Sequence, residues 1–293
     1  MTFLIQTILS GVALGLAYAI LALSINIIYS TFNILNFAQG ELMMLGGMLG
    51  WVFYSQLNLP YPLALIAVMG GCAGVGILEW AMTVWPLSRR HATLISIVIA
   101  TLGFSIVIRI AVLLTMGGVE RFARPPLGSS TVEIGGIHLV SQDFVIVLAT
   151  VLLLLATWWV YTRSSLGLAL RAAAINPEAS RLVGINVSRL TMVVFGLGAA
   201  TAGLAGFLLS PLAYASPSIG LDFAILGFTA AVIGGLGSWP GAVVGGLVLG
   251  VIEALAFRYV SSQWGDFLTF ALMLTILYIR PTGLFRELGA SSA

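Results

Sequence analysis

Long apolar segments that recur along the chain constrain its fold more than any other feature. Of the 293 residues, 60% are hydrophobic and 8% are charged. A run of about twenty apolar residues can cross the hydrocarbon core of a bilayer, and it must cross as a helix because lipid offers no partner to backbone N–H and C=O groups. The sequence therefore predicts an all-α polytopic membrane protein, with residues 1–293 forming a single transmembrane domain.

Eight or nine crossings are expected. They cover residues 4–28, 42–57, 62–85, 93–116, 143–161, 190–209, 223–236, 242–257 and 267–279. No positively charged segment precedes the first, so we interpret it as a retained span and not as a signal peptide. The segment 223–236 is shorter than the ~20 residues of a straight crossing. It is therefore either a tilted crossing or a re-entrant segment.

The arginines indicate the orientation of the chain, because all twelve basic residues are arginine. Nine crossings with the N-terminus outside place eight arginines in the cytoplasm and three outside. The cytoplasmic set is Arg89, Arg90, Arg163, Arg171, Arg181, Arg189, Arg280 and Arg286, and the external set is Arg121, Arg124 and Arg258. This bias agrees with the positive-inside rule.

The sequence contains no lysine. Because a phosphate-binding loop needs a lysine, the chain is not itself a conventional P-loop ATPase, and energy from ATP would come through a partner.

Residues that could support catalysis or bind a metal are sparse. Cys72, the one cysteine, lies in an apolar run and is interpreted as a packing residue. His91 and His138 are far apart in sequence. We find no nucleophile beside a base and no metal-ligand spacing, so we expect no enzyme activity, no metal and no cofactor. The net charge of +2 gives no reason to expect nucleic acid binding.

Residues 162–189 form a polar island between two apolar segments. Its arginines are Arg163, Arg171, Arg181 and Arg189. We expect a helix over 166–174, a break at Asn176 and Pro177 with Asn176 capping a second short helix, and a stop at Gly184. Such a loop would be a rigid docking element. The alternative is a topogenic loop whose arginines only fix orientation.

Polar residues also interrupt the apolar sequence at 31–41, TFNILNFAQGE. This segment either lies at the membrane surface or lines a cavity enclosed by protein, because polar groups in lipid must find partners. Asn36 followed by Gln39 also resembles a helix capping box, an interpretation compatible with both.

Four ionisable residues lie within or against apolar runs, namely Glu79, Arg109, Asp222 and Glu253. A charge at the centre of a membrane helix costs about 2.5–3.5 kcal/mol on insertion scales, so Arg109 should face the bundle and pair with an acid. Glu79 and Glu253 are the candidates. Arg109 is then part of a structural ion pair or of a gate, or it extends to the membrane surface.

Two polar segments are expected outside, 117–142 and 210–222. The first contains the alternating sequence TVEIGGIHLV, which predicts a small hairpin.

The sequence also contains a short internal similarity, called the internal echo below. LNFA at 35–38 and LDFA at 221–224 each precede a glycine pair and a tryptophan. Either an inverted repeat or chance similarity in glycine-rich sequence explains it.

Three motifs carry a resemblance to a known family. They are NFAQGE at 36–41, RAAAINPEASRLVGINVSRLTMVVFGLGAATAGLAG at 171–206 and AVIGGLGSWPGAVVGGLVLGVIEAL at 231–255. Together they resemble bacterial ABC importer permeases for branched-chain and related hydrophobic amino acids. The resemblance implies that 173–184 is a cytoplasmic coupling helix seated in a groove of an ATPase subunit.

The candidate site residues fall into three groups. The ATPase-coupling group is Arg171, Ala173, Asn176, Pro177, Glu178, Ala179, Arg181 and Gly184. The substrate pathway is expected near Asn36, Gln39, Thr101, Arg109 and Asp222, with Arg109 a possible contact for an amino-acid carboxylate. The packing or gating glycines are Gly234, Gly235, Gly241, Gly245 and Gly246.

The resemblance also implies partners and a location. These are a homologous second permease, in a heterodimer in preference to a homodimer, two ABC ATPase subunits and an extracytoplasmic solute-binding protein, in the bacterial inner membrane. The substrate would be a branched-chain or related amino acid. A permease for urea, short amides, sugars or nucleosides, and an ATP-independent secondary transporter, remain alternatives.

Overall fold

The computed structural model describes residues 2–90, 92–128, 131–134, 137–259, 265–280 and 283–285. In chain order its elements are α1 (Thr2–Phe32), α2 (Gln39–Gly50), the π-helical η1 (Trp51–Gln56), α3 (Tyr61–Glu79), the π-helical η2 (Trp80–Val84), α4 (Trp85–Arg89), α5 (Leu94–Met116), β1 (Thr131–Ile134), β2 (Ile137–Val140), α6 (Ser141–Arg163), α7 (Ser165–Ile175), α8 (Pro177–Leu182), α9 (Val187–Ala213), α10 (Gly220–Gly234), α11 (Trp239–Tyr259) and α12 (Gly265–Ile279). The predicted helical architecture is confirmed.

Six helical stretches in the described part of the chain are long and apolar enough to cross a membrane. They are α1, the continuous run Tyr61–Arg89, α5, α6, α9 and α11. Shorter apolar helices include α7 and α10. α10 has 15 residues, a length of about 22 Å against a hydrocarbon core of ~30 Å. The chain is a multi-pass membrane protein, and α10 is too short for a straight crossing, as its sequence predicted.

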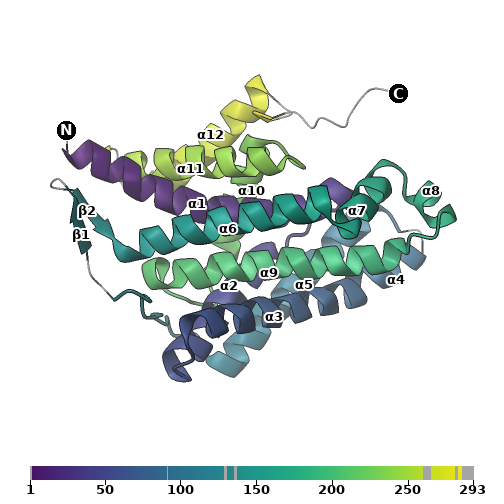
Figure 1. Cartoon of the computed structure of the whole chain (residues 1–293), viewed down its shortest axis with the longest axis horizontal. Coiled ribbons are helices and arrows are strands. Elements are labelled where there is room, and N and C mark those ends of the chain that lie inside the picture. Colours follow the sequence, from purple (N-terminus) through teal and green to yellow (C-terminus); the bar gives the residue numbers. More distant parts are fainter. Residues whose placement is uncertain are drawn as a thin grey trace.

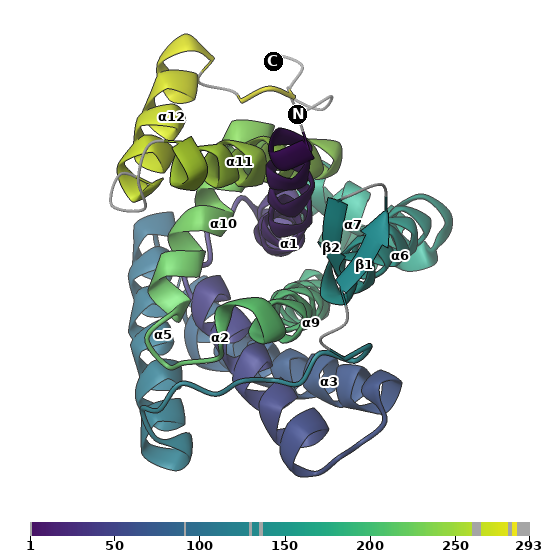
Figure 2. The same ribbon diagram turned by 90° about the vertical axis from the view of Figure 1, so that its left-hand side faces the viewer.

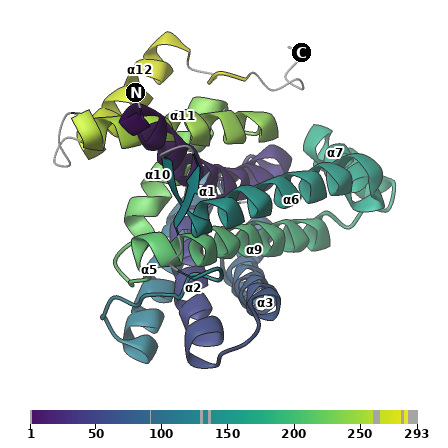
Figure 3. The same cartoon turned by 60° about the vertical axis from the view of Figure 1, so that its left-hand side comes forward.

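The connecting segments gather at the two ends of the bundle. Figure 1 shows the N-terminus of α1 beside the β1–β2 hairpin at one end, and α4, α7 and α8 at the other. α6 and α9 run side by side between these ends (Figure 3). This arrangement agrees with the prediction that the N-terminus and the hairpin share one side of the membrane and the 162–189 loop lies on the other.

The expected hairpin is present. β1 and β2 are antiparallel, with Thr131 opposite Val140 and Ile134 opposite Ile137. The segment predicted at 117–142 ends two residues earlier than expected, because α6 already begins at Ser141. Segments 117–140 and 214–219 are also linked, since the backbones of Arg121 and Ala215 exchange hydrogen bonds of 2.7 and 2.8 Å.

α1 and α9 form the centre of the bundle. Seen from the hairpin end, they lie inside the ring of the other helices (Figure 2), and most of each is buried, whereas little of α6 is buried. Both central helices cross their neighbours through glycines. A Cβ added to Gly250 of α11 would overlap the backbone of Gly15 in α1, and one added to Gly46 of α2 would overlap the backbone of Gly203 in α9. Small residues permit such close helix contacts in membranes.

Candidate functional site

The loop at 162–189 is built from two short helices fixed by three side-chain caps. The Oγ of Ser164 accepts a hydrogen bond from the Gly167 N–H at 3.0 Å and starts α7. Asn176 Oδ1 accepts from the N–H groups of Glu178 and Ala179, both at 3.0 Å, and starts α8. Asn186 Oδ1 accepts from the Arg189 N–H at 3.0 Å and starts α9. The predicted cap at Asn176 is confirmed.

The single helix implied for 173–184 is corrected by the structure. Ala173 is buried within α7, which ends at Ile175. Asn176 then adopts an extended backbone (φ −152°, ψ 101°), because the following Pro177 disfavours helical geometry in the residue before it. α8 covers only Pro177–Leu182, and Gly184 turns the chain away with φ +88°.

The tip of this loop exposes apolar side chains. Ile175, Leu182 and Val183 are 87%, 89% and 77% exposed, respectively. Glu178, Ala179 and Arg181 are exposed beside them, whereas Ser180 is buried. Arg171 lies closer to the bundle, with its guanidinium carbon 5.7 Å from the centre of the Tyr161 ring. A capped knob with an apolar tip is suited to docking into a groove of another protein.

Within the membrane-spanning region, residues 33–38 form a non-helical break between α1 and α2. Asn33 has φ +53° and turns the chain. Buried Asn36 donates from Nδ2 to Glu79 Oε2 at 3.0 Å, and its Oδ1 accepts from the Ala38 N–H at 2.9 Å. The Phe37 N–H donates to Thr101 Oγ1 at 3.5 Å. Residues 36–38 of the break therefore find hydrogen-bond partners within the protein, as non-helical backbone inside a membrane must.

The capping box expected from Asn36 and Gln39 does not form. α2 begins at Gln39, its N-cap residue is Ala38, and the helix start has no side-chain cap. Gln39 is itself buried, and neither atom of its amide has a partner within the described residues. Asn36 instead stabilises the turn that precedes the helix.

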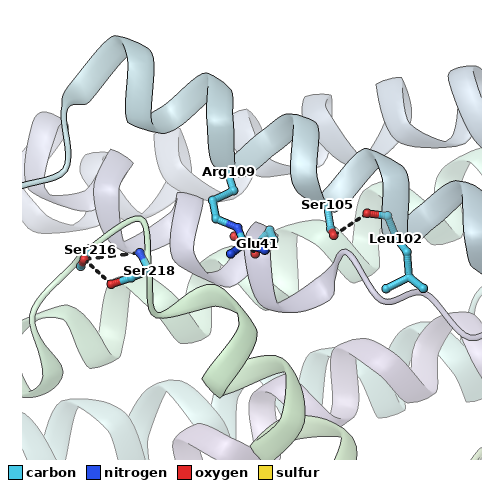
Figure 4. Close-up of polar contacts among 6 residues, drawn as sticks. All are labelled: Glu41, Leu102, Ser105, Arg109, Ser216 and Ser218. Carbon is cyan, nitrogen blue, oxygen red and sulfur yellow. Dashed lines mark hydrogen bonds and ion pairs between the residues drawn. The ribbon is translucent and has the colours of Figure 1, made fainter.

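Arg109 pairs with Glu41, which corrects the expectation of Glu79 or Glu253. The distance from Arg109 Nε to Glu41 Oε1 is 3.3 Å (Figure 4). Glu79 binds Asn36 through one of its oxygens, and Glu253 is buried on α11. The break at 33–38 directs the first turn of α2 against α5, and this places Glu41 beside Arg109.

A cavity of about 340 Å³ is lined by Glu41 of this ion pair, whereas Arg109 is not among its lining residues. Its lining residues come from the 33–38 break and from α2, α5, α10 and α12, and they include Phe37, Glu41, Leu102, Ser105 and Phe228. Leu221 also lines it, whereas the neighbouring Asp222, exposed in the first turn of α10, does not. Of the proposed pathway residues, Asn36 thus lies in the break, Thr101 accepts a hydrogen bond from it, and Arg109 belongs to the ion pair.

The two copies of the internal echo lie at neighbouring helix starts. Residues 35–38 immediately precede α2, and residues 221–224 fall in the first turn of α10. A Cβ on Gly40 would overlap Gly220 and Ala224. The short helices α2 and α10 therefore meet at their N-terminal ends.

The predicted packing glycines lie at helix crossings or turns. A Cβ on Gly234, Gly241 or Gly245 would overlap the facing backbone between α10 and α11, and one on Gly246 would meet α1. Gly235 has φ +108° and ends α10.

Glu41 and Ser105 were not among the candidate site residues predicted from the sequence. Glu41 is one of the polar residues that interrupt the apolar sequence at 31–41, but it was not considered as the partner of Arg109. Ser105 is one turn from Arg109 on α5, a spacing that puts both on one face. That relation could have drawn attention to Ser105.

Comparison with known proteins covers nearly the whole chain. Residues 7–277 match the family described as the branched-chain amino acid transport system permease component. The high-affinity branched-chain amino acid transport system permease protein LivH of Salmonella typhimurium is 33% identical, over 96% of this chain and 95% of that one. BraD of Pseudomonas aeruginosa, described in the same words, is 31% identical over the same shares. The fructose import permease protein FrcC of Rhizobium meliloti is 33% identical over only 44% of this chain and 38% of its own.

The match to the family spans the break at 33–38, the ion pair, the capped loop and the glycine-rich helices. The chain belongs to the branched-chain amino acid transport permease family.

Proposed function

We propose that this chain is the permease subunit of an ATP-driven importer that moves branched-chain or related hydrophobic amino acids across the bacterial inner membrane. The permeases LivH and BraD, which are similar over almost the full length, support this substrate class. The similarity to the fructose permease covers less than half of the chain and supports a sugar less well.

The observation that carries the ATP-driven mechanism is the capped loop between α6 and α9. Each of the two partner ATPase subunits in the importer would bind such a loop on one of the two permeases. Here the apolar tip formed by Ile175, Leu182 and Val183 would enter the ATPase groove. Because three polar caps fix the loop, movement of the ATPase would be passed to α6 and α9 and not absorbed locally.

The proposed importer also contains a solute-binding protein and a homologous second permease, which we infer to be a different chain and not a second copy. The binding protein would dock on the external segments joined by the Arg121–Ala215 backbone pair. Substrate would then pass near the break at 33–38 and the Arg109–Glu41 pair.

The test is copurification followed by transport. Tagged permease extracted in mild detergent should retain an ATPase subunit, and vesicles reconstituted with all components should accumulate leucine only when ATP and the binding protein are supplied. Leucine uptake without any ATPase partner would instead indicate a secondary transporter.

A further inference from the structure

We propose that the cavity between α2, α5, α10 and α12 is the intramembrane site for a zwitterionic aliphatic amino acid. Arg109 would contact the substrate carboxylate, Glu41 its ammonium, and the apolar wall its side chain. This inference rests on the proposed function and adds to it the position and chemistry of the substrate site.

The partial exposure of Arg109 bears on what covers its face of α5. The Arg109 side chain is 38% exposed, and it lies on α5 seven residues before the helix end at Met116, a depth of about 10 Å. A charged side chain at such depth is costly against lipid and instead faces a bundle interior or an aqueous cavity. The face of α5 that carries Arg109 is therefore not a simple lipid-facing surface.

Both members of the ion pair keep binding capacity. Glu41 uses Oε1 for Arg109, while its buried Oε2 has no hydrogen-bond partner within the described residues. Arg109 approaches Glu41 through Nε, and its two terminal nitrogens make no hydrogen bond to any described residue. Buried polar atoms are normally paired, so an unpaired carboxylate oxygen on a residue that lines a cavity can still accept a hydrogen bond.

The geometry of the pair suits an α-amino acid. The carboxylate and ammonium of such a molecule are attached to the same carbon, so their protein contacts must be neighbours. The 3.3 Å approach of Arg109 and Glu41 supplies adjacent groups of opposite charge. Figure 4 shows Arg109 and Ser105 on the same side of α5, both directed toward the start of α2.

The rest of the cavity is suited to an aliphatic side chain. Its wall includes the apolar side chains of Leu102, Ile225, Phe228, Phe270 and Met273. At about 340 Å³ it is near the lower end of small-molecule sites, which span roughly 300–1,000 Å³.

The hydroxyls in the wall already have partners. Ser105 Oγ donates to the Leu102 carbonyl at 2.7 Å, and Thr229 Oγ1 donates to Met273 Sδ at 3.3 Å. Each hydroxyl thus uses its single donor within the protein, and a donor for a substrate carboxylate is left to Arg109.

The test measures water access and substrate protection at single cysteines in the complete reconstituted importer. Leu102→Cys lies in the cavity wall, and Val107→Cys is the matched control, exposed on the same helix but outside the cavity. The native Cys72 is buried and provides the background. The probe is a positively charged methanethiosulfonate, and Ile225→Cys replaces Leu102→Cys if that variant does not fold.

We expect the cavity cysteine to react about tenfold faster than the control, because thiol modification requires access of water and reagent. Millimolar leucine should slow the reaction, whereas leucinol, which lacks the carboxylate, and 4-methylpentanoate, which lacks the ammonium, should not. Arg109→Gln should abolish the protection by leucine.

Equal reactivity of the cavity and control cysteines, or equal protection by all three compounds, would overturn the inference. Either result with ATP-dependent leucine uptake intact would leave the proposed function standing. Loss of ATP-dependent uptake by the unmodified importer would instead contradict the proposed function.

Discussion

Gly46→Ala tests whether α2 and α9 cross by direct backbone contact. A Cβ at Gly46 would overlap the backbone of Gly203 on α9, and a backbone cannot move aside as the end of a flexible side chain can. Overpacking of this kind costs about 1–3 kcal/mol. The better helix propensity of alanine returns about 0.5–1 kcal/mol, so a net loss of up to ~2.5 kcal/mol is expected.

The control is Gly74→Ala on α3, where an added Cβ would meet no atom within 4 Å. This variant gains the same helix propensity without the clash, a stabilisation of about 0.5–1 kcal/mol. The assay is thermal unfolding of the purified protein in detergent. Gly46→Ala should lower the midpoint by a few degrees and Gly74→Ala should leave it unchanged or raise it. If the midpoint of Gly46→Ala were equal to or above that of the control, the close crossing would be refuted.

Two further predictions concern polar contacts. Asn176→Ala removes the acceptor for two N–H groups of α8. The loss should cost about 1 kcal/mol and reduce stimulation of the partner ATPase, whereas Asn176→Asp keeps the cap. Equal stimulation by both variants would contradict a role for the cap. Glu79→Leu should lower the thermal midpoint relative to Glu79→Gln, because only the leucine variant leaves the Asn36 amide N–H without an acceptor. The unsatisfied donor should cost about 1–3 kcal/mol. A leucine variant at least as stable as the glutamine variant would show that this hydrogen bond is unimportant.

Features set by neighbouring residues were predictable from the sequence. The break before Pro177, the Asn176 cap and the turn at Gly184 depend on local backbone geometry, and the structure has all three. The hairpin at 131–140 followed in the same way from its alternation and glycine pair.

The partner of Arg109 could not be found in this way. It depends on where the non-helical residues 33–38 direct α2, and that path is fixed by tertiary contacts such as Asn36 with Glu79. The sequence identified Arg109 as a residue that needs an acid, but several acids satisfied the requirement. The cavity beside the pair likewise arises from elements far apart in the chain. Arg286, predicted to be cytoplasmic, lies outside the described residues.

The most direct test of ATP coupling replaces residues 176–178 with Gly-Ser-Gly in the reconstituted importer. The replacement removes the cap and the first turn of α8 while leaving α6 and α9 intact. Leucine uptake and stimulation of ATP hydrolysis by the loaded binding protein should both be lost, although the ATPase subunits themselves remain active. Uptake and stimulation at the level of the unmodified importer would contradict the role of this loop.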